Sequence, residues 1–169
     1  MSVSIWIFLL VLVSTATDSL LTMTRRCRKG FCIFLPEEAI QADAGLCFVL
    51  PCSFDTPYNF KPLNMVWFKC ETFNSKCGDS DIIFHSNKRN VRDGFKGRVS
   101  LLEPDVTLRN CSIMVNDLTE SDSGFYQLRL NGEKWNGSPD AFTFLVKATV
   151  SVESMTMMCA EDQNISNTY

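Results

Sequence analysis

The sequence has only one histidine, His85, among its 169 residues. A Ser-His-Asp or Cys-His catalytic centre, or a typical zinc site built on histidine, is therefore disfavoured. His85 is more simply explained as a strand-end or loop residue than as a catalytic group. The sequence also lacks a nucleophile motif, a cofactor-binding loop and an identifiable pair of pocket carboxylates. We therefore predict that the protein is not an enzyme and that it holds no cofactor and no metal.

The sequence also lacks an excess of positive charge, since 16 lysines and arginines oppose 19 aspartates and glutamates, for a net charge of −3. A nucleic-acid-binding domain is usually basic, so nucleic acid is disfavoured as a partner. Outside the N-terminus, no apolar run approaches the ~18 residues that suggest a membrane-spanning helix.

The N-terminus is the one strongly apolar segment. Residues 5–13 form an unbroken apolar run, and small residues follow at 14–16. The run is too short to span a bilayer but suits a signal peptide, so we expect residues 1–16 to be a signal peptide cleaved near Ala16. The remaining chain is then secreted, or it is the extracellular part of a longer cell-surface protein whose membrane attachment lies in a missing C-terminal part.

Cysteine is abundant, which suits an oxidising compartment in which most cysteines pair. The eight cysteines are Cys27, Cys32, Cys47, Cys52, Cys70, Cys77, Cys111 and Cys159. The spacing of Cys70 and Cys77 has no second pair of metal ligands nearby, so a metal site is disfavoured there. We expect these two cysteines to bond each other across the connection between two strands.

From residue 32 onward, short β-rich runs alternate with turn signals roughly every 8 to 15 residues, as in an all-β sandwich. The expected strands, lettered as in an immunoglobulin domain, are an initial strand at 31–35, B at 45–54, C at 64–70, C′ at 81–85, D at 97–102, E at 110–118, F at 124–132 and G at 140–152. We expect one domain over residues 32–152. Residues 17–31 are expected to be a solvated basic lead-in, and 153–169 a polar tail or truncated linker.

Several residues have the spacing of the framework of an immunoglobulin variable-type (V-set) domain. Trp67 follows Cys52 by 15 residues, as the core tryptophan of strand C follows the strand-B cysteine. Tyr126 follows Asp122 in the turn into strand F, where it should form a tyrosine corner. Arg98 opens strand D and can reach Asp122 across the base of the sandwich. We expect Trp67, Arg98, Asp122 and Tyr126 to have structural roles.

The cysteine expected on strand F of such a domain is missing, because position 128 is Leu128. Side chains alternate across a strand, so Leu128 faces inward if Tyr126 does. The same alternation, counted back along strand E, makes Cys111 face inward. Strands B and E are neighbours within one sheet. We therefore expect Cys52 to bond Cys111 within that sheet rather than across the sandwich to strand F.

Alternation along strand F places Arg129 on the outward face, in the middle of the strand. A guanidinium there can bind a carboxylate through two parallel hydrogen bonds. An ordinary solvated strand arginine is the alternative explanation of the same pattern.

Four fragments together resemble the N-terminal V-set domain of the sialic-acid-binding immunoglobulin-like lectins, the Siglecs. They are GLCFVLPCSF, NCSIMVNDL, YQLR and KWN, and the resemblance covers about residues 32–152. It implies that Arg129 binds the carboxylate of sialic acid. It also implies that Trp135 packs on the glycerol side chain of the sugar, with Lys134 and Asn136 offering polar contacts. A second aromatic of the family's site corresponds to Phe31 or Phe34. The hairpin from Arg129 to Trp135 is slightly shorter than in the family.

The resemblance also bears on Cys47, since Siglecs carry an extra strand-B cysteine that bonds the following domain. Cys47 is thus expected to be an interdomain or unpaired cysteine, and bonding to Cys27, Cys32 or Cys159 stays open. The Cys70–Cys77 pair is not general in Siglecs and resembles the polymeric immunoglobulin receptor.

The resemblance implies a lectin that binds sialylated glycoproteins or glycolipids in cell adhesion or immune recognition. The alternative is a protein-binding V-set immune receptor ectodomain without lectin activity. Three sequons are also present, at Asn110, Asn136 and Asn164, and Pro139 makes the second a poor acceptor of N-linked sugar.

Overall fold

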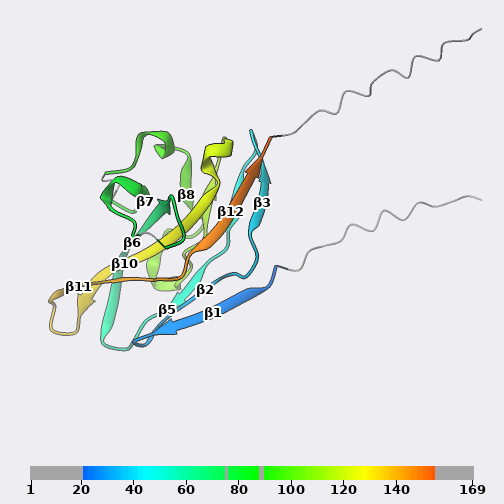
Figure 1. Ribbon diagram of the computed structural model, residues 1–169. Coiled ribbons are helices and arrows are strands. Elements are labelled where there is room, and N and C mark those ends of the chain that lie inside the picture. The colour runs from blue at the N-terminus through cyan, green and yellow to red at the C-terminus, as the bar shows by residue number, and fades with distance from the viewer. Residues whose placement is uncertain (1–20, 75, 88–89, 155–169) are drawn as a thin grey trace, which may run out of the picture.

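The computed structural model describes residues 21–74, 76–87 and 90–154 (Figure 1). Within these residues the regular structure consists of β-strands and short 3-10 helices, and no α-helix occurs. The expected signal peptide, and the expected tail from residue 155 onward, lie outside the described residues. The prediction of an all-β fold is confirmed.

One layer of the sandwich is a mixed sheet with the strand order β3-β12-β10-β6-β7, with β11 pairing β10 as well. Its strands are β3 (Ile40–Asp43), β6 (Phe60–Cys70), β7 (Ile82–His85), β10 (Gly124–Lys134), β11 (Pro139–Thr143) and β12 (Ala148–Glu153). We call it the front sheet. Strand β12 pairs in parallel with β3, a short strand that the sequence pattern did not reveal, and every other pairing in this sheet is antiparallel.

The opposite layer, here called the back sheet, consists of two three-stranded parts in the orders β1-β2-β5 and β4-β9-β8. Its strands are β1 (Met23–Arg28), β2 (Phe31–Pro36), β4 (Phe48–Leu50), β5 (Ser53–Asp55), β8 (Val99–Leu101) and β9 (Ile113–Val115). Strand B of the prediction is thus broken between β4 and β5, around Pro51, which has no backbone N–H to donate. A bridge from Ser53 to Asn110 continues the pairing across the break.

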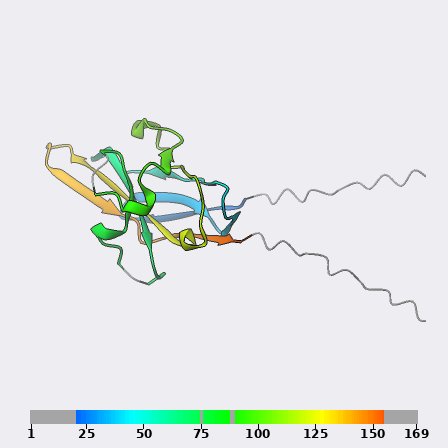
Figure 2. The same cartoon turned by 90° about the horizontal axis from the view of Figure 1, so that it is seen from above.

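The core lies between the two sheets, and period-2 alternation explains its composition. Tyr126, Leu128 and Leu130 alternate along β10 and have no exposed surface, and Trp67 on β6 is equally buried. Figures 1 and 2 show the β10–β11 hairpin extending beyond the rest of the sandwich at one end.

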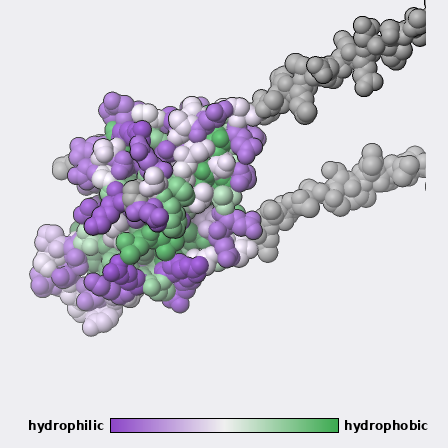
Figure 3. Space-filling view, in the orientation of Figure 1, coloured by the Kyte–Doolittle hydropathy of each residue, from purple (hydrophilic) through white to green (hydrophobic). Residues whose placement is uncertain are grey.

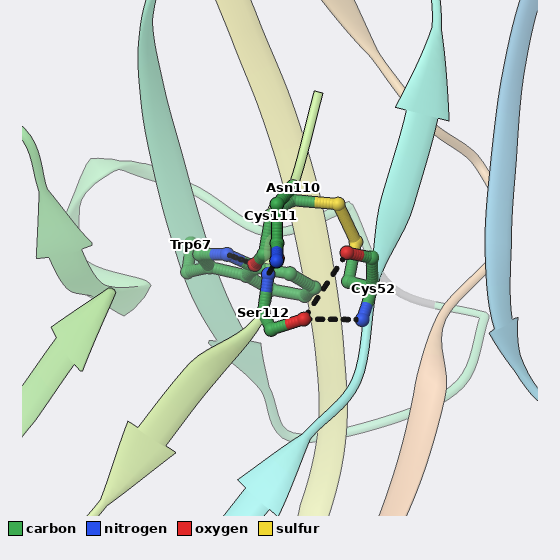
Figure 4. The surroundings of a disulfide bond; sticks show 5 residues. All are labelled: Cys52, Trp67, Asn110, Cys111 and Ser112. Atoms are coloured by element: carbon green, nitrogen blue, oxygen red, sulfur yellow. Dashed lines mark hydrogen bonds between the residues drawn. A yellow bond between two sulfur atoms is a disulfide. The ribbon is translucent and has the colours of Figure 1, made fainter. Parts of the chain in front are cut away.

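The Cys52–Cys111 disulfide lies within the back sheet (Figure 4). The Cα atoms of the two cysteines are 4.8 Å apart, and the backbone N–H of Cys111 donates to the carbonyl of Cys52 at 2.9 Å. The indole Nε1 of Trp67 donates to the carbonyl of Cys111 at 3.1 Å. Because Leu128 occupies the usual strand-F cysteine position, this disulfide does not cross the sandwich.

The base of the sandwich is held by the residues expected to be structural. Arg98 donates to both carboxylate oxygens of Asp122, which is almost fully buried. The hydroxyl of Tyr126 donates to the backbone carbonyl of Asp122 at 2.6 Å, which forms the tyrosine corner. The turn into β10 is therefore tied both to the strand that follows it and to the start of β8.

The prediction that residues 17–31 form a solvated lead-in outside the domain is wrong for the second half of that range. Residues 23–28 form β1, which pairs antiparallel with β2 through a two-residue turn at Lys29 and Gly30. The Cys27–Cys32 disulfide joins the two strands of this hairpin. The basic composition suggested a solvated segment, and most of β1 is indeed exposed. However, its neighbour β2 is strongly apolar and supplies a paired edge that the local composition of residues 23–28 did not indicate.

Strand G is also broken, into β11 and β12. Residues 144–147 between them do not pair as a strand, although Phe144 still donates its backbone N–H to the carbonyl of Leu128 at 3.0 Å. The sequence from residue 140 to 152 predicted one continuous strand, because apolar β-formers run through the break.

Candidate ligand-binding face

Arg129 lies in the middle of β10, opposite Val66 on β6 and Thr143 on β11. Its neighbours Leu128 and Leu130 are fully buried between the sheets, while Arg129 itself is half-buried. The Arg129 side chain therefore emerges on the outer surface of the front sheet, on the side that alternation predicted.

A polar network fixes the side chain of Arg129. Its Nε donates to Oδ1 of Asn131 at 3.0 Å, and Nδ2 of Asn131 donates to Oδ1 of Asn64 at 2.8 Å. In the described part of the chain, none of the ion pairs within 4.0 Å includes Arg129. The guanidinium is thus positioned through one nitrogen and makes no ion pair with the described residues, although Asp79 lines the pocket beside it.

A pocket of about 280 Å³ opens beside Arg129. It is lined by Val66, Phe68, Asp79, Ile82, His85, Asn90, Arg129 and Asn131. Three of these residues, Val66, Phe68 and Ile82, belong to a small buried apolar cluster on the outer side of the front sheet. Apolar surroundings lower the local dielectric constant and strengthen the attraction between a guanidinium and an anion.

His85 also lines this pocket, and the sequence did not indicate that it lies near Arg129. It ends strand β7, as a strand-end histidine was expected to, and its Nδ1 accepts the backbone N–H of Asn87 at 3.0 Å. Asn64 and Asn131 were also missed. Asn131 could have been found from its place two residues after Arg129 on the same face, whereas Asn64 depends on the pairing of β6 with β10.

The hairpin residues do not join Arg129. Strand β10 stays extended through Lys134, and six residues at ~3.3 Å each put Trp135 roughly 20 Å from Arg129 along the strand. Trp135 is 77% exposed, and its Nε1 donates to the backbone carbonyl of Tyr58. Its ring meets that of Tyr58 edge to face, with the centroids 6.0 Å apart.

The structure therefore does not bring Lys134, Trp135 and Asn136 together with Arg129, and their part in ligand binding stays a prediction. The physical reason is the short hairpin: Glu133 pairs with Pro139, so the turn closes beyond the end of β10 and does not fold Trp135 back along β11. Lys134 lies 3.9 Å from a carboxylate oxygen of Asp140. The side-chain oxygen of Asn136 accepts from Ser138 within the same turn.

Neither candidate for the second aromatic is presented to a ligand at Arg129. Phe31 is buried and stacks on Phe142, with ring centroids 4.0 Å apart and an interplanar angle of 5°. Phe34 lies beneath Arg25, whose guanidinium carbon is 5.6 Å from the ring centroid.

The remaining cysteines and sequons are placed as follows. Cys70 is bonded to Cys77, and Cys27 to Cys32, which removes Cys27 and Cys32 as partners of Cys47. Cys47 is exposed and is the free cysteine of the described residues. Asn110 is half-buried and its side chain accepts the backbone N–H of Ser112 at 2.8 Å, whereas Asn136 is exposed. Cys159 and Asn164 lie outside the described residues.

In the part of the chain that the structure describes, no group of three or more histidine, cysteine, aspartate or glutamate side chains could hold a metal ion. No helix in that part has the length and apolar character needed to cross a bilayer.

The two layers, the parallel β3–β12 pair and the tyrosine corner define a V-set immunoglobulin domain. The solved structure of murine CRIg has a similar fold, with a TM-score of 0.54 at 14% identity, covering 78% of this chain and 98% of that one. Residues 42–148, more than half of the chain, match the family described as B-cell receptor CD22-like, first Ig-like. The chain belongs to this family, the N-terminal V-set domains of the Siglecs.

Sequence similarity to individual proteins supports this assignment. The chain is 34% identical to rat myelin-associated glycoprotein over 96 residues, which cover 54% of this chain and 14% of that protein. It is 30% identical to human sialic acid-binding Ig-like lectin 5 over 105 residues, covering 56% and 17%. It is 30% identical to mouse sialic acid-binding Ig-like lectin 10 over 125 residues, covering 71% and 17%. The matched region thus spans less than a fifth of each relative.

Proposed function

We propose that this domain is a lectin that binds terminal sialic acid on glycoproteins or glycolipids, with Arg129 as the anchor for the sugar carboxylate. The observation that supports this most directly is the state of Arg129: outward-facing, half-buried, oriented by Asn131 and without a carboxylate partner among the described residues. The names of two relatives, sialic acid-binding Ig-like lectins, agree with this chemistry.

The proposed contact is a pair of charge-assisted hydrogen bonds between the guanidinium and the carboxylate. The pocket beside Arg129 offers the amide groups of Asn90 and Asn131 to hydroxyl or acetamido groups of the same sugar. With Trp135 at the far end of the hairpin, the apolar contact of the sugar falls instead to the Val66 and Phe68 side of the pocket. We propose a secreted or cell-surface location for the domain, preceded by a signal peptide, as adhesion or immune recognition requires.

The test is binding of a multimerised domain to sialylated cells. Arg129→Ala should reduce binding by at least ~100-fold, because a lost charged hydrogen-bonding partner costs about 3 kcal/mol or more. Arg129→Lys should restore only part of it, since an ammonium cannot form the two parallel hydrogen bonds. Sialidase treatment of the cells should abolish binding of the unaltered domain.

Arg109→Ala is the matched control, because Arg109 is an exposed arginine at the end of the short 3-10 helix Val106–Leu108 and pairs with Asp55 of the back sheet. It should leave binding unchanged. Binding that survives both sialidase and Arg129→Ala would refute the lectin proposal.

The alternative function, a protein-binding V-set receptor, is favoured by one observation. Trp135 and Tyr58 form an exposed aromatic pair at the end of the sandwich, 77% and 86% exposed. Exposed aromatic pairs of this kind are typical anchors of protein interfaces. Under this alternative, Trp135→Ala reduces cell binding whereas sialidase does not.

A further inference from the structure

Two adjacent hollows lie at the side of the sandwich where β1 faces the connection between β11 and β12. They have volumes of about 380 and 220 Å³ and share Arg26, Leu145 and Val146. The space-filling view shows a hydrophobic area near its centre, bordered by hydrophilic residues (Figure 3). We call the combined hollow the β1 groove. Its lining residues belong to β1, β2 and the adjoining Glu37 on one side, and to residues 142–149 and Phe73 on the other.

The break in strand G leaves this side of the sandwich open. β11 ends at Thr143 and β12 begins at Ala148, so residues 144–147 offer no regular strand edge toward β1. Leu145 in this break is 66% exposed, although the apolar side chains of Phe142 and Val146 lie beside it in the smaller hollow. An exposed leucine on an apolar floor marks a contact surface better than a scattered surface leucine does.

The groove is lined by three basic residues, Arg26, Arg28 and Lys147, and by one acidic residue, Glu37, so its net charge is positive. Arg26 and Arg28 pair in register with Ile33 and Phe31, which are buried, so the two arginines share the inward-facing side of the hairpin. Among the described residues, neither arginine takes part in an ion pair. In the same groove, Oγ1 of Thr24 is buried and has no hydrogen-bond partner among the described residues.

β1 is also an edge strand. Among the described residues it pairs with β2 alone, so every second residue of β1 directs its backbone N–H and C=O groups away from the sheet. An edge of this kind is a template for an added strand. The Cys27–Cys32 disulfide joins β1 to β2 and thus holds the edge in place.

We propose that the β1 groove binds an extended acidic segment of a partner protein by strand addition to β1. Carboxylates at alternate positions of the segment pair with Arg26 and Arg28, because side chains two apart lie on one face of a strand. Bulky apolar side chains at further positions on the same face of the segment pack against Leu145 and Val146. Positive rim charges select an acidic partner, and the exposed backbone edge selects an extended one. This site is separate from Arg129, and the inference does not depend on sialic-acid binding.

The probe is a fluorescein-labelled seven-residue peptide in which Thr alternates with the series Leu, Glu, Glu, Leu, titrated against the full chain and followed by anisotropy. A peptide of the same composition with its three threonines in one block is the comparison. We expect the alternating peptide to bind at least ~10-fold more tightly, because only alternation puts its carboxylates and its leucines on the one face that meets both the rim and the floor. Amide hydrogens of β1 should gain exchange protection on binding.

Arg26→Glu combined with Arg28→Glu should weaken binding of the alternating peptide by about 10-fold or more. Lys76→Glu combined with Lys96→Glu changes the net charge by the same amount, but on other loops. This double variant should change the affinity for the alternating peptide by about twofold or less. Leu145→Ser should also weaken binding. Unaltered cooperative unfolding of each variant shows that it is folded.

Equal affinity for the two peptides, or equal effects of the two charge reversals, would overturn the proposal and leave the arginines as protection of an edge strand. Binding of a heparin oligosaccharide that needs Arg26 and Arg28, without peptide binding, would also overturn it and assign the rim to sulfated polysaccharide. Concentration-dependent self-association lost on the same charge reversal, again without peptide binding, would identify a second copy of the chain as the occupant instead.

Discussion

Asp122 is ionisable although it is only 2% exposed, and three neighbouring residues donate hydrogen bonds to it. Arg98 binds both of its oxygens, and the backbone N–H and hydroxyl of Thr119 donate to Oδ2. The backbone carbonyl of Asp122 accepts the hydroxyl of Tyr126. A buried carboxylate with this many donors is tolerated because its hydrogen bonds replace those it made to water. The cluster is therefore structural, as the framework spacing predicted.

The Tyr126 phenol makes the cluster sensitive to alkaline pH. Burial, and then the negative charge of Asp122, raise the pKa of Tyr126 well above its ordinary value. The folded state thus holds the phenolic proton more tightly than the unfolded chain, so this contribution is complete below pH ~10 and is lost as pH rises through the folded pKa. The free energy of unfolding should fall by about 1.4 kcal/mol per pH unit above pH ~10.

Tyr126→Phe should remove this alkaline slope and should cost about 1 to 2 kcal/mol at neutral pH through the lost hydrogen bond. The measurement is urea unfolding between neutral pH and pH ~11, with the exposed thiol of Cys47 alkylated to prevent disulfide exchange. Tyr58→Phe is the control, because Tyr58 is 86% exposed and should leave the slope intact. An unchanged slope in Tyr126→Phe would contradict the argument.

At the scale of elements, the Cys52–Cys111 disulfide closes a much longer segment than the Cys70–Cys77 disulfide, with sequence separations of 59 and 7. In the chain-entropy account, a longer closed loop restricts the unfolded chain more. Replacing Cys52 and Cys111 by alanine should therefore cost about 4 kcal/mol, and replacing Cys70 and Cys77 about 2 kcal/mol.

Urea unfolding of the two double variants, each oxidised and separately purified, tests this order. The fluorescence of Trp67 should report the first variant best, because its indole donates to the carbonyl of Cys111. Equal losses in the two variants would mean that strain or residual structure in the unfolded chain outweighs loop length.

At the scale of the whole molecule, the candidate sugar site is one partly exposed arginine beside a pocket of about 280 Å³. A small, mostly solvated sugar buries little surface, so a single domain should bind weakly. Displayed on a multivalent carrier, the domain should gain ~100-fold to ~10,000-fold in apparent affinity for a sialylated surface. Surface plasmon resonance of monomer and multimer on the same glycan density measures this ratio, and a ratio near unity would contradict a weak lectin that acts by clustering.

Period-2 alternation is a local property, and it was enough to predict several features from the sequence. It put Cys111 and Leu128 inside and Arg129 outside, and the structure agrees for all three. The tyrosine corner at Tyr126 could be predicted in the same way, because Tyr126 and Asp122 are separated by a single turn. These predictions succeeded because each depends on a few consecutive residues and on the pleat of a single strand.

The tertiary structure alone decided the position of Trp135, the membership of β1 in the back sheet and the open side of the sandwich. Trp135 lies far from Arg129 because the register of β10 against β11 sets where the hairpin turns. β1 is a strand because a strongly apolar neighbour offers an edge, and the β1 groove exists because strand G breaks opposite that edge. Pairing, register and closure join residues distant in the chain, so local composition carries little information about them.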